Sequence, residues 1–165
     1  MKLTLSFLLI ASITFSCKRD FSSSAMTEDE KSIRSIRELS NRSIALHDTV
    51  TISNAWTTDY HMITSRNSEV SGRDIATKKF VDEFKSRPDV FYIRTPKTIQ
   101  VFTAWKMASE QGEWTGRWRD KESIIEVGGT YFAKWHKVDN KWLIRAEVFV
   151  PLKCEGGKFC DQSPL

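Results

Sequence analysis

The sequence predicts an α+β fold in which a strongly curved, cone-shaped antiparallel sheet wraps around three helices from the first half of the chain. Residues 27–87 carry helix signals, whereas residues 101–152 form aromatic strand pairs and hold all but one of the six tryptophans. Gly116, Gly128 and Gly129 lie within or at the ends of these strands, where glycine marks a bulge or a sharp bend. The aromatic face must be covered, and only the upstream helices are available to cover it.

The first residues predict export. Residues 1–16 combine an early lysine with an apolar run that is too short to span a bilayer, which indicates a signal peptide. Because Cys17 follows a small residue, the segment resembles a bacterial lipoprotein signal, which implies that Cys17 receives the lipid. Residues 17–26 predict a flexible tether. We therefore expect a lipid anchor in the bacterial cell envelope, on its periplasmic or surface side, with simple secretion as the alternative.

Three helices are expected before the long sheet. The capping box of Thr27 and Glu30 begins the first helix, whose apolar residues keep a helical period to about residue 47. Asp48 caps a short second helix that runs through residue 56. The third helix opens at Ser71 and stops before Pro88, because the residue before a proline avoids the helical region.

Short strands at residues 60–64 and 91–95 are expected to separate the helices from one another and from the long sheet. After Pro96, a long strand begins at Ile99. Gln111-Gly112 then predicts a two-residue hairpin turn, which places Trp105 opposite Trp118.

Asp139-Asn140 predicts a second hairpin turn, between strands at residues 129–137 and 142–150. Counting back from this turn pairs apolar residues on one face: Trp135 with Ile144, Ala133 with Ala146, and Tyr131 with Val148. The reverse face is then polar and carries Lys134, His136, Arg145 and Glu147. Since the inner face is wholly apolar in this register, we expect no carboxylate inside the cone.

The charge pattern argues against nucleic acid as a partner. The formal net charge of +4 falls to +3 when the signal peptide is removed with its lysine. Acidic and basic residues are interleaved, and neither a basic stripe nor a nucleic-acid-binding motif is present.

Cysteine use agrees with export. Once Cys17 is assigned to the lipid, Cys154 and Cys160 remain as an even pair. In an oxidising compartment such a pair forms a disulfide, which here would close the C-terminal tail of residues 153–165. A redox-active or metal-binding pair is the alternative, although the spacing is not C-x-x-C.

Several segments together carry a resemblance to a known superfamily: Ile44-Ala45-Leu46-His47-Asp48, Trp56, Asp59, Ser71-Gly72-Arg73, and Tyr131 to Phe149 with Trp-His-Lys-Val-Asp-Asn-Lys-Trp at its centre. With them, residues 27–152 resemble the nuclear transport factor 2-like superfamily, which includes ketosteroid isomerases and polyketide cyclase-like proteins. The resemblance implies a single domain with a pocket inside the cone, and a homodimer formed through the sheet.

The catalytic set of the superfamily's isomerases is not found in the sequence. The resemblance would imply an aspartate base with an oxyanion hole of a tyrosine and a neutral aspartic acid, but the first helix contains no tyrosine. Asp59 and His61 are the weak catalytic candidates. Asp59 would act as a base, and the imidazole of His61, at the mouth of the cone, would act as an acid or base near neutral pH. A turn residue and a half-buried strand residue are the respective alternatives. With three scattered histidines, neither a metal site nor a cofactor is expected.

The expected ligand-binding residues are His61, Arg94, Trp105, Trp118, Tyr131 and Trp135. Arg94 would bind a carboxylate or another anion if it points inward, and would be a surface charge if it points outward. The aromatic residues would stack on a flat apolar ligand, or simply form the core.

Two functions remain open. The first is a lipid-anchored envelope protein whose single cone domain is a non-catalytic small-molecule-binding or interaction module, with a small apolar ligand and a membrane contact through its lipid. The second is a small enzyme of the isomerase, cyclase or hydrolase type that acts on an apolar carbonyl compound in the pocket, using His61 or Asp59 with Arg94.

Overall fold

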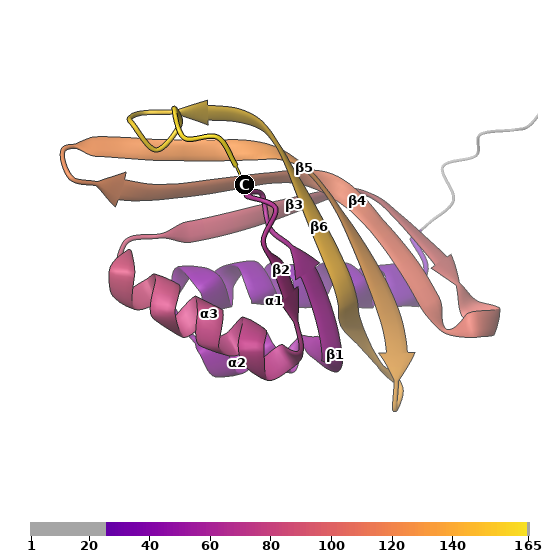
Figure 1. Ribbon diagram of the computed structural model, residues 1–165. Helices are drawn as coiled ribbons and strands as arrows, with labels where there is room; N and C mark the ends of the chain where they lie inside the picture. Colours follow the sequence, from indigo (N-terminus) through magenta and orange to yellow (C-terminus); the bar gives the residue numbers. More distant parts are fainter. Residues whose placement is uncertain (1–25, 165) are drawn as a thin grey trace, which may run out of the picture.

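The computed structural model describes residues 26–164, so the predicted signal peptide, the predicted lipid site Cys17 and most of the predicted tether lie outside the described residues. A single six-stranded sheet with the strand order β2-β1-β6-β5-β4-β3 curves around three helices (Figure 1). The helices are α1 (Glu28–Ala45), α2 (Thr49–Asn54) and α3 (Arg73–Ser86). The strands are β1 (Trp56–Ile63), β2 (Glu69–Ser71), β3 (Phe91–Phe102), β4 (Met107–Asp120), β5 (Ser123–Val138) and β6 (Lys141–Glu155). The predicted α+β class and curved sheet are confirmed, although β1 runs parallel to β6.

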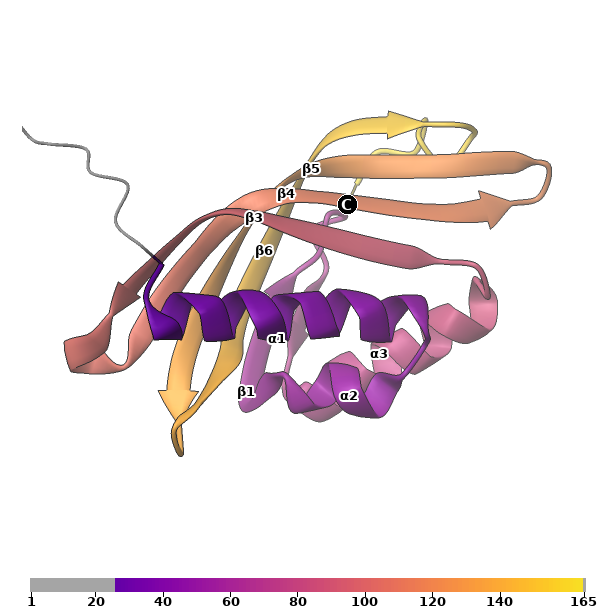
Figure 2. The ribbon, with the colours of Figure 1, turned by 180° about the vertical axis from the view of Figure 1, so that it is seen from behind.

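Helix α1 lies across the concave side of the sheet (Figure 2). The Thr27 side chain accepts a hydrogen bond from the Glu30 amide at 3.2 Å, as the capping box predicts. The buried face of α1 is not wholly apolar, because Arg37 and Ser40 share it with Ile33 and Ile44. This helix therefore brings a cation and a hydroxyl into the interior.

The short helices α2 and α3 also begin near the expected residues. Asp48 caps α2 by accepting a hydrogen bond from the Thr51 amide at 3.0 Å. Helix α3 begins after Gly72, whose φ of +95° favours glycine, while Ser71 ends β2 and makes no capping bond. Among the residues described, no helix is long and apolar enough to cross a membrane.

The first predicted hairpin is wrong. Gln111 and Gly112 lie in the middle of β4, and the chain turns instead at the short 3₁₀ helix Thr103–Trp105. Gly112 serves a close approach rather than a turn, because a Cβ there would lie 2.2 Å from the Thr95 carbonyl oxygen. Strand β3 can run through Pro96 because it is an edge strand with a bulge at that point.

The second hairpin turn is confirmed, but its register changes within the strands. Asp139 and Asn140 both have positive φ, which suits a type I′ turn, and Trp135 pairs with Ile144 as expected. A bulge between Lys134 and Trp135 then shifts the pairing by one residue, so that the next pairs are Lys134 with Ala146, Ala133 with Glu147, and Tyr131 with Phe149. The shift turns Glu147 from the predicted outer face to the buried inner face.

A second bulge, at Gly128 and Gly129, confirms that glycine marks an irregular point of the sheet. A Cβ at Gly129 would lie 2.0 Å from the Val150 carbonyl oxygen, so no larger residue fits without backbone movement. Beyond this point β6 continues to Glu155, and Cys154 and Cys160 form the expected disulfide.

Candidate functional site

A cavity of about 900 Å³ lies between the concave face of the sheet and α3. Its apolar walls come from strands and helix alike and include Trp56, Met62, Phe80, Trp114, Trp118 and Phe149. Phe159, from the disulfide-closed loop, also lines the cavity and packs edge-on against Trp118, with ring centroids 4.8 Å apart. Aromatic rings therefore form much of the apolar wall, while charged side chains of α3, among them Lys78, Lys79 and Glu83, also line the cavity.

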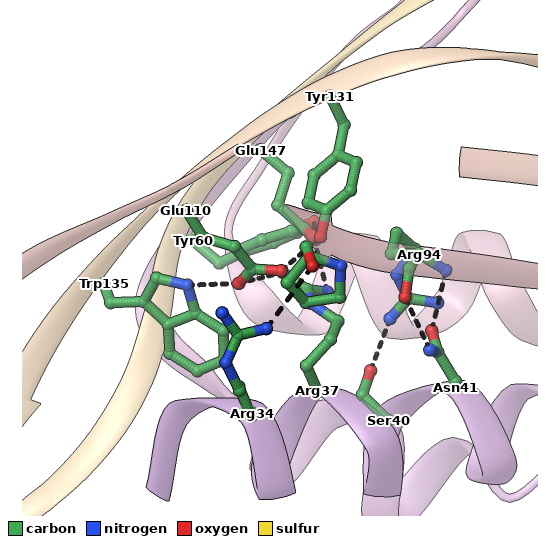
Figure 3. Close-up of polar contacts among 11 residues, drawn as sticks. Arg34, Arg37, Ser40, Asn41, Tyr60, Arg94, Glu110, Tyr131, Trp135 and Glu147 are labelled. Atoms are coloured by element: carbon green, nitrogen blue, oxygen red, sulfur yellow. Dashed lines mark hydrogen bonds and ion pairs between the residues drawn. The ribbon is translucent and has the colours of Figure 1, made fainter. Parts of the chain in front are cut away.

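Three polar side chains, Tyr60, Arg94 and Glu147, line this cavity although each is buried. They come from β1, β3 and β6, and Figure 3 shows them converging above α1. Buried ionisable groups that converge on an apolar cavity are typical of functional sites. We call these three residues the polar end of the cavity.

Arg37 connects the polar end to the core. Its Nε and Nη2 donate to the two carboxylate oxygens of Glu110 at 2.8 and 3.2 Å, and its Nη1 lies 2.8 Å from Glu147 Oε1 (Figure 3). The contact with Glu147 is an ion pair without the geometry of a hydrogen bond. One cation thus serves two buried carboxylates.

Both carboxylate oxygens of Glu110 accept hydrogen bonds from side chains. Besides Arg37, Tyr131 donates its hydroxyl proton to Oε1, and Trp135 donates from Nε1 to Oε2 at 2.6 Å. Arg37 also lies over both aromatic rings, 5.4 Å from the Tyr131 centroid and 5.3 Å from that of Trp135. Because neither Glu110 nor these two aromatic residues lines the main cavity, this part of the network is structural.

Arg94 is bound less completely. Its Nη2 donates to Ser40 Oγ at 2.6 Å, and its backbone is fixed by two hydrogen bonds with the Asn41 side chain. Its Nε and Nη1 are buried and have no hydrogen-bond partner among residues 26–164. Burial and the neighbouring Arg37 charge lower the pKa of Arg94 from 12.5 to about 10.

Glu147 and Tyr60 keep opposite proton states. Burial alone would raise the pKa of Glu147, but the charges of Arg37 and Arg94 lower it below its usual value, so this carboxyl is ionised. Burial and the adjacent carboxylate raise the pKa of Tyr60 well above 10, so its hydroxyl keeps its proton and donates it to Glu147 Oε2 at 2.6 Å. The polar end therefore offers N–H donors and a neutral hydroxyl, whereas a carboxylate so stabilised is a weak base.

The two candidate catalytic residues lie away from this polar end. Asp59 is exposed and pairs with Arg145 at 3.0 Å. The nearby Thr57 side chain and the Arg145 charge lower the pKa of Asp59. His61 faces Glu69 at 4.0 Å. Neither side chain lines the cavity, because Tyr60 and Met62 occupy the inward positions of β1.

The predicted ligand-binding residues separate into groups. Arg94 and Trp118 line the cavity, whereas Tyr131 and Trp135 lie behind it on Glu110. Trp105 lies on the turn before β4 with 70% of its surface exposed, so its expected place opposite Trp118 was wrong; Trp118 instead pairs with Ile125.

Sequence reasoning missed Arg37, Tyr60, Glu110 and Glu147. A signal existed for Arg37, which lies four residues after Ile33 on the apolar stripe of the first helix. A signal also existed for Glu110, because it lies on the same face of its strand as Ala108 and Trp114. The misplaced turn interrupted that strand in the prediction. Within the described part of the chain, no group of three histidine, cysteine, aspartate or glutamate side chains is arranged to hold a metal ion.

No protein-family model and no curated protein sequence matches this chain. Solved structures do match. A proposed aromatic ring hydroxylase from Novosphingobium aromaticivorans is 15% identical, with a TM-score of 0.71, over 84% of this chain and 99% of that one. A type 2 hexachlorocyclohexane dehydrochlorinase (LinA) is 10% identical, with a TM-score of 0.69, over 78% and 88% of the two chains.

A nuclear transport factor 2-like protein with a cystatin-like fold, also from Novosphingobium aromaticivorans, is 12% identical, with a TM-score of 0.62, over 76% of this chain and 83% of that one. At such identities the similarity concerns the path of the backbone, not the chemistry of the pocket. The chain therefore has the nuclear transport factor 2-like, or cystatin-like, fold that its sequence indicates.

Proposed function

We propose that the protein binds a small, largely apolar molecule inside its cone. The observation that carries this proposal is the aromatic cavity of about 900 Å³ with a polar end formed by Tyr60, Arg94 and Glu147. Its volume falls within the range typical of small-molecule sites, and such sites pair apolar walls with a few polar groups that orient the ligand. An open apolar cavity of this size would also cost stability if it served the fold alone.

Binding without turnover fits the proton states better than catalysis. Glu147 is ionised and is engaged by Arg37 and Tyr60, so it is not a free base. An enzyme acting on an apolar carbonyl compound is the second candidate, since Arg94 lines the cavity with N–H groups that have no partner among the described residues and would polarise a carbonyl oxygen. Similar folds include a dehydrochlorinase, so this architecture accommodates catalysis in other proteins.

The proposed location is the bacterial cell envelope, with the domain held by a lipid on Cys17, or secreted if that cysteine is not lipidated. The disulfide between Cys154 and Cys160 supports an oxidising compartment. Pairing of two copies through the outer face of the sheet is a further proposal. Exposed apolar residues on that face, among them Phe132 and Val150, are the feature that supports it.

Native mass spectrometry of the protein isolated from its own membranes tests these proposals together. We expect a retained small molecule on the intact protein, and the masses also report lipidation and dimer formation. Val127→Trp should remove the retained molecule, because Val127 lines the cavity and the larger ring fills it. Val138→Trp is the matched control, since Val138 is exposed beside the β5–β6 turn. A retained molecule that survives in Val127→Trp would contradict binding in the cone.

A further inference from the structure

We infer that the ligand of the cone carries a negative charge, a carboxylate or a similar oxyanion, which Arg94 binds at the polar end of the cavity. This inference rests on the proposed small-molecule function and names the class of ligand. It would give the bound molecule two parts, an aromatic or otherwise flat apolar body against the tryptophan walls and an anionic head on the arginine.

The first step is the unmet hydrogen-bonding capacity of Arg94. A guanidinium has five N–H groups, and the only protein acceptor of the Arg94 guanidinium among the described residues is Ser40 Oγ, bound by Nη2. Its Nε and Nη1 are buried without an acceptor, although the side chain lines the cavity. Since buried donors without partners are costly, an acceptor delivered through the cavity would gain strong bonds there.

The second step is the sign of the charge. The network contains two cations, Arg37 and Arg94, and two carboxylates, Glu110 and Glu147. Both carboxylates contact Arg37, whereas no carboxylate oxygen of the described chain lies within 4.0 Å of the Arg94 guanidinium nitrogens. Arg94 is therefore a buried cation without a direct counterion, and a charged oxygen is the acceptor that its unpartnered N–H groups bind most strongly.

The third step excludes the neighbouring residues as substitutes for the ligand. Glu147 is the nearest candidate counterion within the fold, but its Oε1 faces Arg37 and its Oε2 accepts from Tyr60. The backbone of Arg94 is pinned to Asn41 on α1, so the strand cannot easily move toward Glu147. The remaining open direction for a partner of Arg94 is the cavity that it lines.

A matched pair of probes tests this inference. 2-Naphthoate and 2-naphthamide share a flat apolar body and differ in the charge of the head group. At pH 7 we expect the naphthoate to bind at least about tenfold more tightly, since hydrogen bonds to charged groups are the stronger ones. Binding is measured by isothermal titration calorimetry and by quenching of tryptophan fluorescence in the full-length protein.

Two variants assign the preference to one residue. Arg94→Met should abolish the preference for naphthoate, so that the two probes bind with affinities within about twofold of each other. Arg119→Met is the matched control, because Arg119 is exposed on β4 and does not line the cavity. If Arg94→Met fails to fold, Arg94→Lys, which keeps the charge but loses the planar fork, should weaken naphthoate binding alone.

Each outcome has a distinct meaning. Equal binding of the two probes to the unmodified protein overturns the inference about charge and leaves the proposed small-molecule function in place. A preference for naphthoate that persists in Arg94→Met overturns the assignment to Arg94. If neither probe binds at millimolar concentration, and no molecule is retained in native mass spectrometry, both the inference and the proposed function are refuted.

Discussion

The two buried arginines should contribute very differently to stability when each is replaced by methionine. Arg37 is 1% exposed and Arg94 is 5% exposed, so the substitutions Arg37→Met and Arg94→Met remove the same group from equally buried positions. Methionine keeps much of the side-chain length and is flexible enough to fill the space that is left. The comparison therefore isolates the electrostatic surroundings of each guanidinium.

For Arg37→Met we expect a loss of about 3–5 kcal/mol in the free energy of unfolding, the cost of breaking a buried ion pair from one side. The substitution removes two hydrogen bonds to Glu110 and the ion pair with Glu147. Both carboxylates then remain buried with hydroxyl or indole donors but no adjacent cation. Since the net stability of a domain is about 5–15 kcal/mol, this loss is a large fraction of it.

For Arg94→Met we expect a change of no more than about 1 kcal/mol in the free energy of unfolding. The variant loses one hydrogen bond to Ser40, but it also removes a buried cation whose donors are largely unpartnered. At about 1.4 kcal/mol for each pKa unit, a pKa lowered from 12.5 to about 10 indicates that the charged side chain is unfavourable here by on the order of 3 kcal/mol. The two contributions oppose each other and leave a small difference.

Urea unfolding followed by tryptophan fluorescence at pH 7 measures both variants, provided that the slope with denaturant stays constant. The reasoning is refuted if both variants lose the same stability, or if Arg37→Met loses less than about 1 kcal/mol. A large loss in Arg94→Met alone would mean that Glu147 depends on Arg94 rather than on Arg37 for its charge.

Three further predictions concern pH, the disulfide and the corrected register. The pKa of Glu147 is lowered in the folded protein, so the contribution of this carboxylate to stability is complete above pH 4.5. That contribution is lost as the pH falls through the pKa of Glu147 in the folded protein. The free energy of unfolding should therefore fall more steeply from pH 7 to pH 3 for the unmodified protein than for Glu147→Gln. Replacing Cys154 and Cys160 together by serine should cost about 2 kcal/mol in the chain-entropy model, and a reducing agent should have no further effect on that variant. Trp135→Ala should lower the free energy of unfolding by about 3–5 kcal/mol, because Trp135 is fully buried. Trp105→Ala, on the exposed turn, should lower it by less than about 0.5 kcal/mol. Equal losses of stability in thermal unfolding would contradict the observed register.

The local signals of the sequence predicted the helices well because each depends on neighbours along the chain. Thr27 and Asp48 cap their helices through residues three positions away, and Pro88 ends the third helix through its own ring. The Asp139-Asn140 turn is equally local, since both residues accept positive φ. No knowledge of the rest of the molecule was needed for these elements.

The prediction of the first hairpin turn failed because a glycine such as Gly112 can serve two different purposes. An X-Gly pair closes a turn when the glycine takes a positive φ, but a glycine inside a strand also permits close approach of a neighbouring chain. The carbonyl of Thr95 and the ring of Tyr131 occupy the space where a Cβ would stand. Those contacts come from β3 and β5, so the sequence near Gly112 could not distinguish the two uses.

The polar end of the cavity escaped prediction because a single inserted residue creates it. Counting outward from the Asp139-Asn140 turn is correct as far as Trp135 and Ile144, after which Arg145 has no partner in the ladder and the pairing shifts. One residue of shift exchanges the two faces of a strand, so Glu147 moves inward. A register without the bulge would have kept the inner face apolar, as the sequence suggested.

The bulge is favourable only because Arg37 is present. An ionised carboxylate turned into the cone without a cation would cost several kcal/mol. Arg37, on a helix that begins more than a hundred residues earlier, supplies the counterion at 2.8 Å, and Tyr60 supplies a hydroxyl at 2.6 Å. The register of the last hairpin, and with it the chemistry of the cavity, is thus selected by a long-range ion pair that no local pattern encodes. It follows that Arg37→Met should not only destabilise the protein but also loosen the β5–β6 pairing beyond the bulge, which amide hydrogen exchange would detect as faster exchange of the β5–β6 hydrogen bonds beyond the bulge than of those between the bulge and the turn.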